Sequence, residues 1–153
     1  MLRIIAGVVA GYTAMALVVF LSLTAAYLAM GADRAFQPGV YDVTALWLVV
    51  MFLVSLIAAV IGGKVCALLG KSRKAVLALA GLVLVLGLLS AIPALKPPPG
   101  EPPARTGEVP NLEAMMKARQ PAWVALLLPV IGVVGVLFGG RVKPAISSPI
   151  AAA

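Results

Sequence analysis

Long apolar stretches alternate with short polar segments along the whole chain. Four of these stretches contain no charged side chain, and the segments between them carry glycine, proline and charged residues. A helix needs about 20 apolar residues to cross the hydrocarbon core of a membrane, which is about 30 Å thick. The pattern therefore predicts four membrane-spanning helices, at residues 4–30, 44–63, 75–92 and 122–140.

Two of the predicted spans share their end residues. Trp47 stands near the start of the second span and Trp123 near the start of the fourth, and the two spans run into the similar sequences GGKV and GGRV. A true repeat would make the chain two tandem helical hairpins related by an axis along the membrane normal. A chance match of common boundary residues is the alternative, and the sequence leaves both open.

The segments between the spans are predicted from their turn residues. Residues 31–43 read as a loop whose Phe36 and Tyr41 should lie at the lipid headgroups. Residues 96–110 are rich in proline and should be irregular or polyproline II, either as a strap between two helices or as a ligand for a proline-binding groove. The tail, residues 141–153, is predicted to be disordered.

Residues 111–120, NLEAMMKARQ, are predicted to form a short interfacial helix on the outer membrane surface. Asn111 can cap its start, and Glu113 lies in the first turn, where the helix dipole favours negative charge. Leu112, Met115 and Met116 share one face at helical spacing, which suits contact with lipid.

Composition supports the membrane assignment. The 153 residues are 63% hydrophobic and 11% charged, whereas about 25% of residues in soluble proteins are charged. The mean hydropathy is +1.13. We therefore expect an all-α, integral membrane four-helix bundle that forms a single membrane domain over residues 1–153.

Cationic residues are divided unevenly between the two sides that four spans create. The side with both termini holds seven of the twelve lysines and arginines and no acidic residue, and the other side holds five cations and all five acidic residues. Cations are retained in the cytoplasm, so we expect a multi-pass protein with both termini cytoplasmic. Spans rich in Ala, Val and Leu fit a bacterial plasma (inner) membrane. The cations expected to contact anionic lipids are Lys64, Lys71, Arg73, Lys74, Arg141 and Lys143.

Glycines are spaced for helix packing in two of the spans. Small residues let helix backbones approach closely in lipid, where no water drives helices together. The resulting packing face serves either the bundle itself or a partner subunit. On this reasoning Gly135→Leu should disrupt packing, whereas Val136→Leu on another face should be mild. The predicted packing residues are Gly7 and Gly11 in the first span and Gly132, Gly135 and Gly139 in the fourth.

The sequence offers no catalytic constellation. It contains no histidine, which is the commonest general base and metal ligand, and its one cysteine, Cys66, has no partner for a disulfide. All five carboxylates lie in the loops of one side. Aromatic residues do not interleave with the basic ones, as nucleic-acid binding would require. We therefore expect no enzyme activity, no cofactor, no metal and no nucleic-acid partner.

Residues 58–89, AAVIGGKVCALLGKSRKAVLALAGLVLVLGLL, resemble the glycine-glycine hairpins of small uncharacterised bacterial four-helix membrane proteins. The resemblance covers about a fifth of the chain. It implies a helical membrane bundle, and that family has no established activity to carry over.

Two classes of function remain on this evidence. The first is a non-catalytic accessory subunit or assembly factor of a larger membrane complex, whose partners are lipids and other membrane subunits or a second copy of the chain. The second is a small transporter or channel for a small solute. A polar-lined cavity between the hairpins would favour the second class, and a tightly packed bundle with an exposed glycine face would favour the first.

Overall fold

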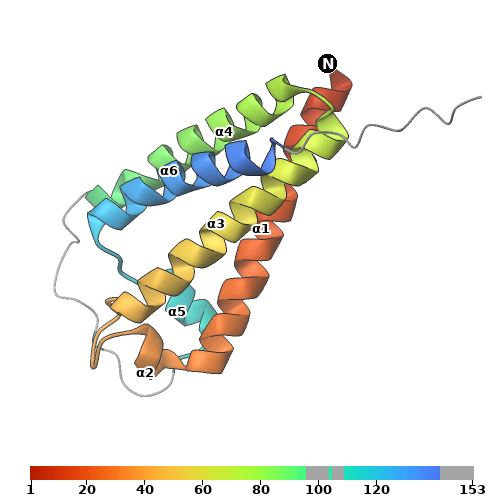
Figure 1. The fold of residues 1–153 in the computed structure, drawn as a ribbon. Helices are drawn as coiled ribbons and strands as arrows, with labels where there is room; N and C mark the ends of the chain where they lie inside the picture. The colour runs from red at the N-terminus through yellow and green to blue at the C-terminus, as the bar shows by residue number, and fades with distance from the viewer. Residues whose placement is uncertain (96–103, 105–108, 142–153) are drawn as a thin grey trace, which may run out of the picture.

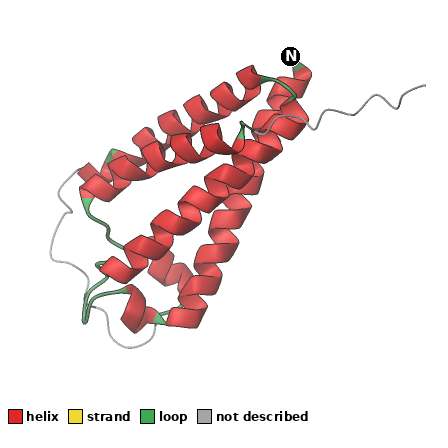
Figure 2. Cartoon of the chain, in the orientation of Figure 1, coloured by secondary structure: helices red, strands yellow, loops and turns green. Residues whose placement is uncertain are grey.

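The computed structural model describes residues 1–95, 104 and 109–141. Most of the predicted proline-rich loop, the tail beyond Arg141 and the predicted lipid-binding residue Lys143 lie outside this part of the chain. The described residues are helices joined by short loops and turns, and they form no strand (Figure 2). The predicted all-α fold is confirmed.

Four long helices make up the body of the molecule, and each is long and apolar enough to cross a membrane. This fits a multi-pass membrane protein. The long helices are α1 (Leu2–Met30), α3 (Ala45–Gly70), α4 (Arg73–Ala91) and α6 (Ala122–Gly139). The short elements are α2 (Ala32–Ala35), the 3-10 turn η1 (Pro93–Leu95) and α5 (Asn111–Lys117).

The helix of the second span runs past residue 63, where the predicted span ends. It continues to Gly70, and Gly62 and Gly63 are buried at helix contacts within it. Lys71 then takes a left-handed conformation with φ of 46° and ends the helix. Ser72 caps α4 by accepting a hydrogen bond from the Lys74 backbone N–H at 3.2 Å. Two residues are thus enough to reverse the chain.

The four long helices form two pairs of unequal length. With a rise of 1.5 Å per residue, α1 and α3 are each about 40 Å long, while α4 and α6 are each about 28 Å long. Only the second pair matches the hydrocarbon core of about 30 Å. Figure 1 shows the pairs close together near the N-terminus and apart at the opposite end. The α1–α3 pair therefore extends further, and α2 and α5 gather at its far end (Figure 1).

The core of the bundle lies where α1, α3, α4 and α6 converge. Its fully buried side chains include Leu79, Cys66 and Val136 from three different helices. Val136 is 0% exposed, so the expectation that Val136→Leu would be mild is wrong. Its carbonyl and Cα lie against Gly63 of α3, so the Val136 backbone cannot move toward α3 to make room for a larger side chain.

An aromatic cluster forms a second core at the far end of α1 and α3, which we call the cap. Its rings meet edge to face: Tyr27 lies 6.3 Å from Phe36 and 6.1 Å from Trp47, and Phe36 lies 5.8 Å from Tyr41. Phe36 and Tyr41 are only 2% and 3% exposed, so their rings pack against each other and do not face lipid headgroups. The loop folds back on itself and buries these rings together, which removes their apolar surface from water.

Residues distant in sequence tie the cap together. The Tyr27 hydroxyl donates a hydrogen bond of 2.6 Å to the Val109 carbonyl. The Arg119 backbone N–H donates to the Tyr41 carbonyl at 2.9 Å, and the Val43 N–H donates to the Arg119 carbonyl at 3.1 Å. The helix predicted over residues 111–120 therefore ends at Lys117, and Arg119 runs extended. Pro121 contributes to this ending, because the residues before a proline disfavour helix.

Asn111 does not cap α5 as predicted. Pro110 occupies the capping position, and the Asn111 side chain instead donates to the Thr24 hydroxyl of α1 at 3.4 Å. Glu113 fixes the opposite side of α5, because its Oε1 accepts from the Tyr41 hydroxyl at 3.1 Å and from Lys117 Nζ at 2.7 Å. These hydrogen bonds, that of Lys117 first, hold the pKa of the Glu113 carboxyl below its ordinary value. The hydrogen bond to Glu113 likewise raises the pKa of Lys117.

We expect the cap to loosen in acid. The pKa of Glu113 is lowered in the folded state, so its stabilisation is complete above the ordinary carboxyl pKa and is lost as the pH falls through the lowered value. Trp47 packs against the cap and can report this step by its fluorescence in a Trp123→Phe background. Glu113→Gln should remove the step, and Lys117→Met should shrink it. An acid step of unchanged size in Glu113→Gln would show that another group controls the cap.

Candidate functional site

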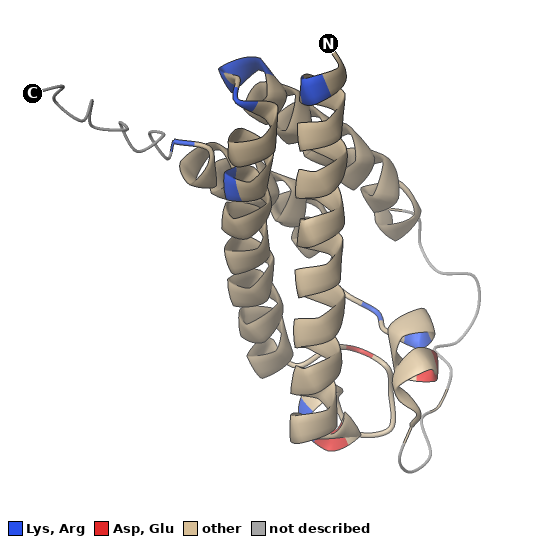
Figure 3. Ribbon diagram, turned by 90° about the vertical axis from the view of Figure 1, so that its right-hand side faces the viewer, with Lys and Arg blue, Asp and Glu red and all other residues tan. Residues whose placement is uncertain are grey.

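The charged residues lie at the two ends of the bundle (Figure 3). The end with the N-terminus, which we call the basic end, carries those predicted lipid-binding cations that the structure describes, and all of them are exposed. The cap end carries the acidic side chains Asp33, Asp42 and Glu113 among the described residues. The described members of the basic end are Arg3, Lys64, Lys71, Arg73, Lys74 and Arg141.

The predicted glycines of α1 lie directly against α3. A Cβ atom on Gly7 would come within 2.7 Å of the Gly70 Cα. A Cβ on Gly11 would lie 2.8 Å from the Gly62 carbonyl oxygen, and a Cβ on Gly62 would lie 2.8 Å from the Gly11 carbonyl oxygen. Real Cβ atoms do not make such contacts, so the two backbones touch only because these residues are glycine.

The glycines of α6 also face the same chain. A Cβ on Gly135 would lie 2.5 Å from the Ala59 Cβ, and one on Gly139 would collide with the Val60 carbonyl, both on α3. Gly132 instead faces α4, where its Cβ would lie 2.7 Å from Val83 Cγ1. The predicted glycine face of the fourth span is thus buried within the bundle, and a partner subunit has no access to it.

Sequence reasoning missed other glycines that matter as much. Gly62 meets α1 and Gly63 meets the Val136 carbonyl of α6, although the sequence marked the pair only as the end of the second span. Gly87 of α4 lies against Pro129 of α6, where a Cβ would come within 2.6 Å of Pro129 Cγ. The spacing of Gly62, Cys66 and Gly70 at one turn each was the available signal, because such small residues mark a packing face.

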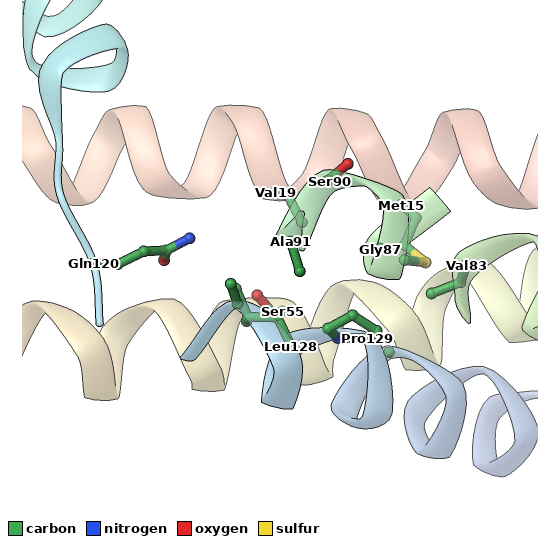
Figure 4. A pocket seen from close by; sticks show the side chains of 12 residues that line it. Met15, Val19, Ser55, Val83, Gly87, Ser90, Ala91, Gln120, Leu128 and Pro129 are labelled. Carbon is green, nitrogen blue, oxygen red and sulfur yellow. The ribbon is translucent and has the colours of Figure 1, made fainter. Parts of the chain in front are cut away.

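A cavity of about 250 Å³ lies between the two helix pairs. Figure 4 shows side chains from α1, α3, α4 and α6 around it. Its wall is mostly apolar, and its polar side chains are Ser55, Ser90 and Gln120. The remaining lining residues are Met15, Val19, Val83, Gly87, Ala91, Ala125, Leu128, Pro129 and Gly132. An apolar wall of this kind suits an apolar ligand better than a polar solute.

A second, more polar recess of about 370 Å³ lies at the cap end. Gln37, Asp42 and Arg119 line it together with Val43, Gln120 and Pro121. Gln120 borders both spaces, and Figure 4 shows its amide extending from the connection between α5 and α6 toward the cavity. The cavity and the recess therefore meet at one residue.

The described residues provide no group of three or more His, Cys, Asp or Glu side chains that could hold a metal ion. The side chains around the cavity are all uncharged. The cavity can thus bind an apolar group, and its few polar side chains can donate and accept hydrogen bonds.

Comparison with known proteins finds no match to a protein family, to a curated protein or to a solved structure. The class defined by the fold is that of small all-α membrane bundles with four apolar helices. The resemblance of residues 58–89 to small bacterial membrane proteins stays a prediction.

We expect Gly135→Leu to destabilise the monomer itself. The new side chain would meet Ala59 and the Leu56 carbonyl, and overpacking of this kind costs about 1–3 kcal/mol or more. The matched control is Val134→Leu, because Val134 is exposed and such changes cost less than about 0.5 kcal/mol. Retention on size-exclusion chromatography after heating in detergent measures the difference. Equal stability of the two variants would mean that α3 and α6 pack differently.

Proposed function

We propose that the chain is a non-catalytic accessory subunit or assembly factor of a larger membrane complex, and that it meets its partner through the cap. The glycine faces are occupied within the bundle, so they do not support this proposal. The observation that carries it is the exposed face of α5, where Leu112 is 71% exposed and Met116 is 79% exposed.

This face is apolar and held in place. Ala114 on the opposite side of α5 is 2% exposed, and Glu113 and Asn111 bind Tyr41 and Thr24. Fixed apolar side chains lose little freedom on binding, and methionine is enriched at protein interfaces. The sequence predicted that the same face lies against lipid headgroups, which is the competing interpretation and which the experiment below separates.

We infer further that the basic end faces the cytoplasm of a bacterial cell. Support comes from the exposed cations at this end and from the location of Met1 and Arg141 there. The exposed lysines and arginines would then lie beside anionic lipids, each contributing about 1 kcal/mol of attraction near the surface.

A reporter that is active only in the cytoplasm, fused to the C-terminus, tests this orientation. We expect full activity, and we expect none for the same reporter inserted after Gly39, in the loop of the cap. The reverse pattern would place the cap in the cytoplasm.

A pull-down from native membranes tests the accessory role. The tagged chain, extracted in a mild detergent, should elute with a fixed set of membrane proteins, or as a defined oligomer of itself. Leu112→Glu combined with Met116→Glu should elute as a folded monomer, because two buried charges would oppose the interface. Arg34→Glu, also exposed in the cap, is the control for added negative charge and should keep the complex.

Two results would contradict the proposal. One is a parent chain that is always monomeric. The other is a double variant that keeps its partners but releases α5 from the membrane surface, as shown by a fluorophore on α5 becoming accessible to an aqueous quencher. The second result would support the lipid-facing interpretation.

The second function class, a small transporter, is favoured by one observation: the cavity lies between the two helix pairs and meets a polar recess. Its apolar wall does not match the polar-lined cavity expected for a polar solute. Flux through reconstituted vesicles that stops in Ser55→Phe would support this class instead.

A further inference from the structure

We propose that the cavity and the recess together bind one phospholipid of the surrounding bilayer, with an acyl chain in the cavity and a zwitterionic headgroup in the recess. This inference is independent of the accessory role, which rests on α5. It concerns a defined lipid site at the cap end, distinct from the general attraction of anionic lipids to the basic end.

The depth of the cavity matches one leaflet. Its walls run along α6 from Gln120, just before the helix, to Gly132. From the start of α6 at Ala122 to Gly132, a rise of 1.5 Å per residue gives about 15 Å. This is half of a hydrocarbon core of about 30 Å. A cavity that begins at the headgroup level and ends near the midplane is as deep as the acyl chains of one leaflet are long.

The wall of the cavity suits a hydrocarbon chain. Leu128, Val19 and Val83 contribute apolar surface from three helices, and Pro129 closes the space against Gly87. Ser55 and Ser90 are uncharged, and a serine hydroxyl in a helix can bond to the backbone of the preceding turn. Water gains few partners in such a space, whereas an acyl chain makes dispersion contacts with all four helices.

The recess carries one charge of each sign. Arg119 and Asp42 both line it, and neither forms an ion pair within the part of the chain that the structure describes. Their backbones are fixed by the bridge that joins residues 42 and 119. A guanidinium suits a phosphate, and a carboxylate suits an ammonium group. A headgroup with both groups, such as phosphoethanolamine, complements both side chains.

Gln120 joins the two halves of the site. Its amide borders the apolar cavity and the polar recess, which is the position of the glycerol ester region in a bound lipid. An amide can donate to and accept from ester oxygens and hydroxyls. A polar side chain at this boundary can bind the part of the ligand that joins its polar end to its apolar end.

Photolabelling tests the acyl-chain part. The full-length protein is reconstituted in phosphatidylcholine vesicles that contain a small fraction of phosphatidylethanolamine with a diazirine near the end of one acyl chain. We expect labels on the cavity walls, in residues 83–91 and 125–132. Ser55→Phe should fill the cavity and lose these labels, whereas Leu53→Phe, two residues away on the exposed face of α3, should keep them.

The variants are first compared on size-exclusion chromatography, and Ser55→Leu replaces Ser55→Phe if the larger side chain does not fold. Labels that persist in the cavity-filling variant, or that fall only on exposed positions such as Val9 and Phe20, would overturn the proposal, because the lipid would then be ordinary surrounding lipid.

The headgroup part is tested with the same diazirine chain on phosphatidylglycerol, which has the phosphate but no ammonium group. The parent should be labelled more strongly by the ethanolamine lipid. Asp42→Asn should abolish this preference, and Arg119→Gln should lower labelling by both lipids. Arg34→Gln, outside the recess, is the control. Equal labelling of the parent by both lipids would overturn the assignment of a zwitterionic headgroup.

Discussion

Backbone contact at two adjacent glycines of α3 holds the bundle together. Neighbouring residues of a helix point about 100° apart, so Gly62 meets α1 while Gly63 meets α6. Water does not drive helices together in lipid, and close approach of backbones has to supply the attraction. The central helix can hold a neighbour on each side only because neither position carries a side chain. The placement of α4 follows, since it packs on α6 through Gly87 and Val83.

The cap depends on a different force from the bundle. Its aromatic rings are buried against each other at the end that carries the described acidic residues, and its polar groups are paired through Tyr27, Tyr41 and Glu113. Burial of rings away from water drives this part, whereas dispersion between small residues drives the part within the membrane. The extra length of α1 and α3 joins the two parts into one body.

The sequence predicted the helices well because hydropathy over a long window is insensitive to tertiary contacts. It also predicted close packing at Gly7 and Gly11, since their spacing alone defines a helix face. The cap was not predictable in this way. Tyr27 binds Val109 across 82 residues, and only the folded chain brings Arg119 beside Tyr41. Aromatic residues such as Phe36 and Tyr41 in a loop next to a span look the same in the sequence whether their rings face lipid or pack against each other.

The candidate site was even less visible in the sequence. Its wall takes a few scattered residues from each of four helices, and only Ser55 from α3, and its size depends on the angle between the helix pairs. No local pattern encodes that angle. Pro129 stands in the middle of the fourth span in the sequence, but its role as a wall of the cavity against Gly87 appears only when α4 and α6 are placed together.

The burial of Cys66 has a practical consequence. It is the only cysteine of the chain, and its thiol is enclosed between α1, α3 and α4 with no exposed surface. A maleimide or a spin label that reacts with exposed thiols should leave the native protein unmodified while it stays folded. A cysteine introduced at any exposed position would then be the one reactive thiol. The natural sequence is thus a ready background for distance measurements, and modification of Cys66 itself would report unfolding.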